Sequence, residues 1–297
     1  MWRWALVLLV SLAVPAAADA AAPVKVGDGP LLGLAARGGA AFVVFERDSA
    51  STPLALVRSS GSSAGRPAAF GGPGAENVDM AAGAEGVRIA WSRTISSAFE
   101  YFVAPAQRLA DPESAGFGTG PPQLDAAGEL AYPDRVGNAT LAGRPLTDDA
   151  PEHRHLPLDA AGGLVLDLDQ QRTHTELRLL GGPSRPILSV SRLADVEASL
   201  AISGHTAYVA YAIGGSTLLA TQRGDGWTTR RIASGTSGRP AVARAGSTTY
   251  VAYARNGAVR LGGARIAAGG GPLLATDGTR VFAGYTHAGR AYLFRAR

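Results

Sequence analysis

Two groups of residues in the sequence have side chains suited to chemistry, and the first is a metal-ligand cluster. The stretch "DDAPEHRH" gathers Asp148, Asp149, Glu152, His153 and His155. Imidazoles and carboxylates bind divalent metal ions in proteins, and in an extended segment His153 and His155 project to one side. We therefore take these five residues as a candidate metal site. The alternative is a solvated loop between two structural units.

The second group consists of aspartates that precede small turns. "LDAAG" occurs twice, with Asp125 and Asp159, and "VDMAAG" carries Asp79. If their strands line one channel, three carboxylates held close together raise each other's pKa or recruit a cation. The sequence thus predicts a ligand-binding arc for a calcium ion, a basic ligand or a sugar, and calcium is the one cofactor it suggests. The alternative is that each aspartate only caps its own hairpin.

Signatures of covalent catalysis are weak in this chain. Cysteine is absent, which excludes disulfides, thiolate zinc sites and a cysteine nucleophile. "GSSAG" places Ser63 where a serine nucleophile would stand, but Pro67 follows and no helical pattern continues the motif. We therefore assign no catalytic residue.

The elements that position these side chains are internal repeats. Each repeat has an apolar strand, a small turn with a glycine, and a second apolar strand. The spacings between the glycines are 45, 45, 34, 42, 42 and 32 residues, which is typical of four-stranded propeller blades. The glycines are Gly38, Gly83, Gly128, Gly162, Gly204, Gly246 and Gly278.

Two near-copies of one strand show what surrounds it. "TAYVAYAIGG" (206–215) and "TTYVAYARNG" (248–257) do not alternate between apolar and polar residues, so both faces of each strand must be buried. Blades of a propeller are covered on both sides by their neighbours. The sequence predicts an all-β propeller of seven blades. Six blades remain the alternative, because the third unit is irregular around Pro133.

The two ends of the chain complete this prediction. The last unit shows three strands and ends with "RAYLFRAR", whereas "PVKVGD" (23–28) alternates like an edge strand. We expect this N-terminal strand to close the ring as the outer strand of the last blade. Deletion of residues 21–28 would then lower the melting temperature by several degrees.

The first 20 residues resemble a signal peptide, with Arg3, a short apolar run and small residues at its end. We expect residues 1–20 to be cleaved and 21–297 to form one propeller domain, secreted or in the cell envelope. No transmembrane segment is expected after cleavage, and a retained anchor is the alternative. The net charge is +4 and the arginines are scattered, which argues against a nucleic-acid partner.

Units such as "PQLDAAGELAY" (122–132), and the hairpin "GDGWTTRRIAS" (224–234), resemble repeats of secreted bacterial β-propellers of the sialidase-like kind. The resemblance covers about residues 30 to 297 and implies the fold, although the Asp-box pattern Ser-x-Asp-x-Gly-x-Thr-Trp is absent. We expect a non-catalytic binding module at or outside the cell surface, with a protein or carbohydrate ligand. The alternative is a carbohydrate-active enzyme, a glycosidase or lyase with carboxylates in the central funnel.

Overall fold

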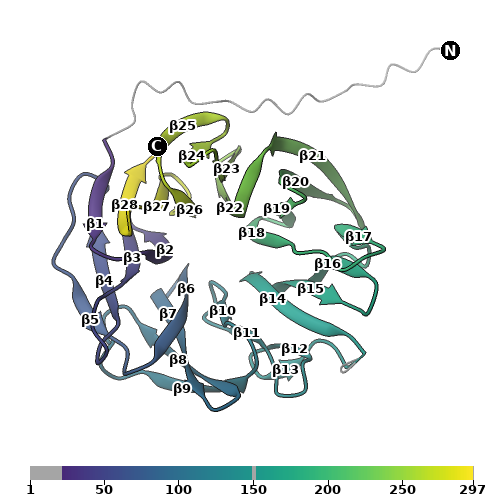
Figure 1. The fold of residues 1–297 in the computed structure, drawn as a ribbon, viewed down its shortest axis with the longest axis horizontal. Helices are drawn as coiled ribbons and strands as arrows, with labels where there is room; N and C mark the ends of the chain where they lie inside the picture. The colour runs from purple at the N-terminus through teal and green to yellow at the C-terminus, as the bar shows by residue number, and fades with distance from the viewer. Residues whose placement is uncertain (1–21, 149–151, 297) are drawn as a thin grey trace.

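Seven four-stranded antiparallel sheets are arranged in a ring (Figure 1). The computed structural model describes residues 22–148 and 152–296, and the strands of this part are connected without any helix. The predicted seven-bladed propeller is therefore confirmed. The predicted signal peptide lies outside the described residues, and in the residues that are described no helix has the length and apolarity needed to cross a membrane.

Blades 1 to 4 follow one another along the chain, each as a meander that starts at the centre of the ring and runs outward. Blade 1 comprises β2 (Leu31–Arg37), β3 (Ala40–Glu46), β4 (Leu54–Ser59) and β5 (Ala68–Phe70). Blade 2 comprises β6 (Ala75–Gly83), β7 (Gly86–Ile95), β8 (Ala98–Pro105) and β9 (Glu113–Gly118). Blade 3 comprises β10 (Gln123–Leu124), β11 (Leu130–Pro133), β12 (Ala139–Leu141) and β13 (Arg144–Pro145). Blade 4 comprises β14 (Arg154–Ala161), β15 (Leu164–Gln170), β16 (Thr175–Leu180) and β17 (Leu188–Val190).

Blades 5 to 7 continue the same pattern and bring the chain back to its start. Blade 5 comprises β18 (Glu197–Ser203), β19 (Thr206–Ile213), β20 (Ser216–Arg223) and β21 (Gly226–Ser234). Blade 6 comprises β22 (Thr236–Ala245), β23 (Thr248–Arg255), β24 (Ala258–Leu261) and β25 (Ala264–Ala268). Blade 7 comprises β26 (Gly270–Thr276), β27 (Val281–His287), β28 (Arg290–Arg295) and, from the N-terminal end, β1 (Val24–Gly27).

Strand β19 explains why its sequence does not alternate in polarity. Val209 and Tyr211 pack into a core cluster with leucines of blade 4, whereas Tyr208 and Ala210 pack against Val242 and other residues of blade 6. Both faces of the strand are covered by a neighbouring blade. Apolar surface buried between blades stabilises the ring by about 25 cal/mol per Å².

The ring is closed by the predicted N-terminal strand. Val24 pairs with Leu293 and Lys25 with Tyr292, and Val26 is buried in the core cluster between blades 7 and 1. The tight hairpins follow the sequence as well. Asn256 and Gly257 both have positive φ, which a two-residue turn between β23 and β24 requires.

Candidate functional site

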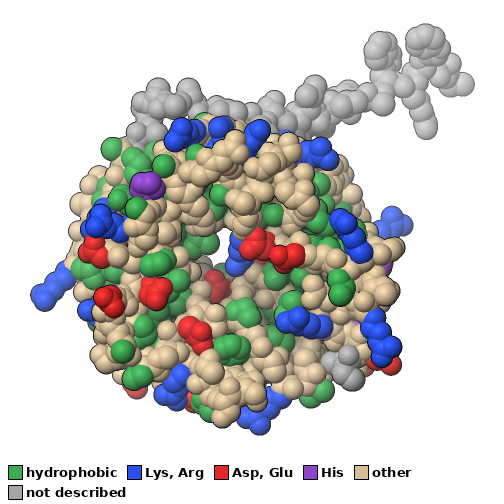
Figure 2. Space-filling model, viewed as in Figure 1, with side chains coloured by type: hydrophobic (Ala, Val, Ile, Leu, Met, Phe, Trp, Pro, Cys, Tyr) green, Lys and Arg blue, Asp and Glu red, His purple; other side chains and the backbone are tan. Residues whose placement is uncertain are grey.

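The central channel is lined by residues from the first strand or first turn of every blade. It encloses a cavity of about 310 Å³, and the opening is visible at the centre of the ring in Figure 2, with charged side chains near it. Alanines form much of the wall, including Ala35, Ala201, Ala243 and Ala275, so the inner strands leave space along the axis. Against this small-residue wall, two aspartates and two arginines stand out: Asp79, Asp159, Arg239 and Arg244.

Asp159 is fixed in the channel by three donors. Its Oδ1 accepts a hydrogen bond from the Ala160 N–H at 2.9 Å, and its Oδ2 accepts one from the Leu200 N–H of blade 5 at 2.8 Å. The guanidinium of Arg239 also reaches Oδ2, at 3.3 Å. Asp159 therefore joins blade 4 to blade 5 and forms an ion pair with blade 6.

Asp79 joins blade 2 to blade 3 in a similar way, because its Oδ2 accepts a hydrogen bond from the Leu124 N–H at 2.6 Å. Burial in the channel raises the pKa of Asp79 to about 6, and the negative charge of Asp159 adds to this rise. Burial also raises the pKa of Asp159, while Arg239 opposes that rise. The single guanidinium of Arg239 thus interacts with two partly desolvated carboxylates, Asp79 and Asp159. Binding of a proton or of a ligand would lower the electrostatic cost of holding these two carboxylates together.

Three buried polar atoms of the channel have no hydrogen-bond partner in the described chain. They are Ser199 Oγ, Arg239 Nε and Arg244 Nε. Arg244 is otherwise held by its Nη1, which donates to Thr249 Oγ1 at 2.7 Å, and by the ring of Tyr208 at 4.9 Å. Leaving a buried donor unpaired costs about 1–3 kcal/mol, so these atoms mark a place where a ligand or solvent must supply partners.

Asp125 does not belong to this channel, which corrects the predicted arc of three carboxylates. Its Oδ1 accepts hydrogen bonds from the N–H groups of Ala127 at 2.8 Å and Glu129 at 3.0 Å, and its Oδ2 accepts one from Gly163 of blade 4 at 3.0 Å. It lines a separate cavity of about 210 Å³. Asp125 caps its own turn, as the alternative interpretation of these aspartates predicted, and it also links blades 3 and 4.

Asp277 has the same arrangement as Asp125 at another blade junction. Its Oδ1 accepts hydrogen bonds from the N–H groups of Thr279 at 3.0 Å and Arg280 at 2.7 Å, and its Oδ2 accepts one from Gly39 of blade 1 at 2.7 Å. Burial opposes ionisation here, but these donors outweigh it and hold the pKa of Asp277 at about 2. We call Asp125 and Asp277 the turn aspartates, and Asp79 and Asp159 the channel aspartates.

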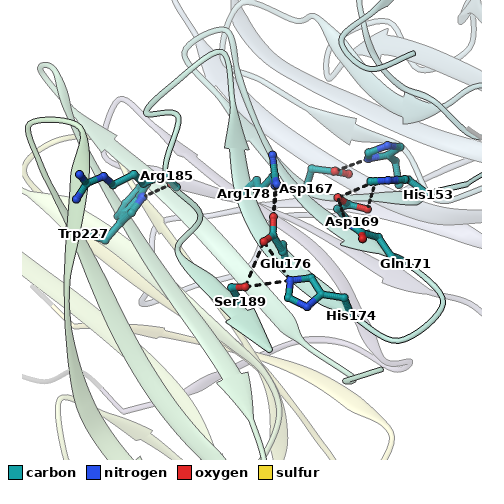
Figure 3. A network of polar contacts seen from close by, with 11 residues as sticks. His153, Asp167, Asp169, Gln171, His174, Glu176, Arg178, Arg185, Ser189 and Trp227 are labelled. Atoms are coloured by element: carbon teal, nitrogen blue, oxygen red, sulfur yellow. Dashed lines mark hydrogen bonds and ion pairs between the residues drawn. The ribbon is translucent and has the colours of Figure 1, made fainter. Parts of the chain in front are cut away.

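The predicted metal-ligand cluster is only partly assembled as expected. His153 and His155 do project to one side, with their rings stacked at 6.1 Å. Asp148 and Glu152 are exposed and do not join the group of potential metal ligands found in the described residues, and Asp149 lies outside those residues. The partners of the histidines are instead Asp167 and Asp169 on strand β15, shown with His153 in Figure 3.

A third polar group in blade 4 contains serine, histidine and glutamate but lacks the geometry of a catalytic triad. Ser189 Oγ lies 3.0 Å from His174 Nε2, and Glu176 Oε1 lies 3.1 Å from the same nitrogen (Figure 3). In a triad the serine and the acid bond to different ring nitrogens, so that the histidine transfers a proton between them. Glu176 also accepts a bond from Arg178 Nε at 2.6 Å, which makes this group an outer-strand ion-pair network.

Five residues of these sites were not predicted from the sequence: Ser199, Arg239 and Arg244 in the channel, and Asp167 and Asp169 in blade 4. A signal for the last two existed, because "LDLDQ" places alternate acids in a middle strand that should be apolar on both faces. Arg239 and Arg244 interrupt the apolar first strand of the sixth unit in the same way.

Comparison with known proteins supports the fold and leaves the activity open. No protein-family model and no curated protein matches the sequence. Among solved structures, a puromycin-hydrolysing peptidase of Mycobacterium tuberculosis is similar, with a TM-score of 0.57, 13% identity, and coverage of 90% of this chain and 52% of that one. The β-propeller domain of the Trilobed protease from Pyrococcus furiosus has a TM-score of 0.53, 13% identity, and coverage of 90% and 95%.

A sialidase of Trypanosoma rangeli is also similar, with a TM-score of 0.50, 7% identity, and coverage of 92% of this chain and 55% of that one. This chain thus spans about half the length of the peptidase and the sialidase, and nearly all of the isolated propeller domain. Likeness at such low identity shows a common fold only. Peptidases and a sialidase share it, so the function must be argued from the site.

Proposed function

We propose that the protein is an exported β-propeller that acts as a binding module, with the central channel as the binding site for a small polyhydroxylated ligand of the carbohydrate class. The observation that carries this proposal is the set of three buried, unpartnered polar atoms in the channel, Ser199 Oγ, Arg239 Nε and Arg244 Nε. Export rests on the signal-like sequence of residues 1–20.

The chemistry of the channel fits hydroxyl groups. Each hydroxyl both donates and accepts a hydrogen bond, and the channel offers arginine donors beside carboxylate acceptors. The cavity of about 310 Å³ is at the lower end of the range of small-molecule sites and suits one or two sugar rings. The backbone bonds of Asp79 and Asp159 hold both carboxylates in place before a ligand arrives, which lowers the entropic cost of binding.

One observation favours the second candidate function, a glycosidase. A pKa of about 6 lets Asp79 keep its proton in mildly acidic solution, which is the property of a general acid, while Asp159 stands nearby as a second carboxylate. A binding module releases its sugar unchanged, whereas a glycosidase cleaves an aryl glycoside. Assays with aryl glycosides of common hexoses and pentoses separate the two, and turnover that disappears in Asp79→Asn would replace the first proposal with the second.

The binding proposal is tested by calorimetric titration with a panel of mono- and disaccharides that includes glucose, galactose and N-acetylglucosamine. We expect at least one to bind, and Arg239→Gln to weaken it about tenfold or more, because a charged donor is removed. Arg231→Gln is the matched control, since Arg231 is exposed on the outer strand β21. Equal weakening by both variants, or binding by no member of the panel, contradicts the proposal.

A further inference from the structure

Strands β14 and β15 place one histidine and two aspartates on one face of blade 4, because His155 is directly opposite Asp169 in the strand pairing and Asp167 is two residues before Asp169. His153, directly before β14, stacks its ring on that of His155 and contacts Asp169. Val165, which shares this face, packs with alanine and leucine residues of blade 3. The four polar side chains therefore lie toward the junction of blades 3 and 4, where an apolar core would be expected.

The contacts among these four side chains are short and mostly buried. His153 Nδ1 lies 3.0 Å from Asp169 Oδ1 and 3.1 Å from Oδ2, and His155 Nδ1 lies 2.7 Å from Asp167 Oδ2. The side chain of His153 is 24% exposed, those of His155 and Asp169 are 3% exposed, and that of Asp167 is fully buried. One ligand atom from each of His153, His155 and Asp169 lies within 4.8 Å of the others.

The separation between His153 Nδ1 and Asp169 Oδ1 fits a common metal ion. Two ligand atoms that each lie about 2.1 Å from a Zn²⁺ ion are about 3.0–3.4 Å apart, which is close to the observed distance between His153 and Asp169. The pairing of His155 with Asp167 matches the carboxylate–histidine–metal arrangement, in which a carboxylate accepts one ring N–H and so orients the other nitrogen as ligand.

A second, independent observation favours a cation at this position. Asp167 Oδ1 is buried and has no hydrogen-bond partner in the described chain. Burying two carboxylates beside two imidazoles costs desolvation free energy unless positive charge compensates it, supplied either by protons or by a metal ion.

We propose that His153, His155 and Asp169 bind one divalent transition-metal ion of the zinc class, with Asp167 as the positioning residue that orients His155. All three ligands belong to blade 4, so the ion ties the start of β14 to the end of β15 on the face toward blade 3. The inference is separate from the channel, because the two sites share no residue.

The test uses the full chain without an affinity tag, washed with a chelator and then titrated with Zn²⁺ by calorimetry. We expect one Zn²⁺ per chain and a rise in melting temperature with Zn²⁺ that Ca²⁺ does not reproduce, because imidazole ligands favour transition metals. Binding of Co²⁺ to the unmodified protein gives a second readout, since its visible absorption reports nitrogen and oxygen ligands around the ion.

Variants then locate the ion. His153→Gln and Asp169→Asn should each weaken Zn²⁺ binding more than tenfold, whereas His205→Gln and Asp225→Asn, both in exposed turns, should leave it unchanged. His153 is partly exposed, so its variant is expected to fold even if a change at the buried Asp169 disturbs the blade. No stoichiometric Zn²⁺ binding by the unmodified protein, or equal affinity in His153→Gln, overturns the proposal.

Discussion

Asp277, a turn aspartate, and Asp79, a channel aspartate, both fasten one blade to the next, yet their pKa values are shifted in opposite directions. Asp277 accepts hydrogen bonds from three backbone N–H groups at a partly exposed turn, and its pKa is about 2. Asp79 lies in the channel near a second carboxylate, and its pKa is about 6. Where hydrogen-bond donors lower the pKa by more than burial raises it, the carboxylate stays ionised and stabilises the fold. Where burial and a like charge raise the pKa by more than the donors lower it, the carboxylate favours binding of a proton or a ligand.

The largest expected effect is the loss of a turn aspartate. Asp125→Ala removes the acceptor of three backbone N–H groups from a buried position. We expect the free energy of unfolding to fall by about 2–4 kcal/mol, measured by urea denaturation at pH 7. Asp225→Ala, at an exposed turn, is the control and should change the value by less than about 0.5 kcal/mol. Similar values for both variants would show that the turn bonds do not stabilise the ring.

A smaller effect of opposite sign is expected at the channel. Because the folded pKa of Asp79 is about 6 and its ordinary value is 3.8, the folded protein binds more protons than the unfolded chain between pH 4 and 6. This group therefore lowers stability as pH rises through that window. Asp79→Asn keeps an oxygen acceptor for the Leu124 N–H and removes the charge.

We expect Asp79→Asn to be about 1–2 kcal/mol more stable than the unmodified protein at pH 7, after allowing for solvent in the channel, and not more stable at pH 4. Urea denaturation at both pH values measures the difference. If the variant were less stable than the unmodified protein at pH 7, the ionised Asp79 would stabilise the fold as Asp277 does, which would contradict the difference between the two aspartates.

The smallest effect concerns Asp277 in acid. Its folded pKa of about 2 lies below the ordinary 3.8, so its stabilising contribution is present above about pH 4 and is lost as pH falls toward 2. We expect Asp277→Asn to lose about 1 kcal/mol at pH 7, and the difference from the unmodified protein to shrink between pH 4 and 2. Denaturation curves across this range give the comparison, with Asp225→Asn as control. A difference that stays constant with pH would rule out the ionised carboxylate as its cause.

The fold was predictable because its signals are local and repeated. The apolar copies at 206–213 and 248–255, the Asn256–Gly257 turn and the alternating N-terminal segment each specify their own structure, and closure of the ring follows from their number. The position of Asp125 outside the channel also has a local cause. Asp125 follows the two-residue strand β10, so it belongs to the turn and folds back on it instead of facing the channel.

The channel site was only half predictable, because it depends on contacts across the ring. Asp79 lies four residues before Gly83 and Asp159 lies three residues before Gly162, yet both line the channel, because the turn in blade 2 is at Ala84 and Glu85, one residue after the glycine used to align it. Arg239 of blade 6 meets Asp159 of blade 4 only after the ring is closed. Arg239 and Asp159 are 80 residues apart in the sequence, and no local pattern predicts such a contact. The sequence therefore identified the channel aspartates but not the channel arginines.

The most direct test of the binding account is to observe the channel arginines while a sugar binds. In the ¹H–¹⁵N spectrum of the arginine Nε–H groups, assigned by Arg239→Gln and Arg244→Gln, we expect these two signals to shift saturably when the saccharide that binds in calorimetry is added. The signals of Arg230 and Arg231, exposed on β21, should not move. Saturable sugar binding that leaves both channel signals unchanged, or no binding at all, would contradict the account.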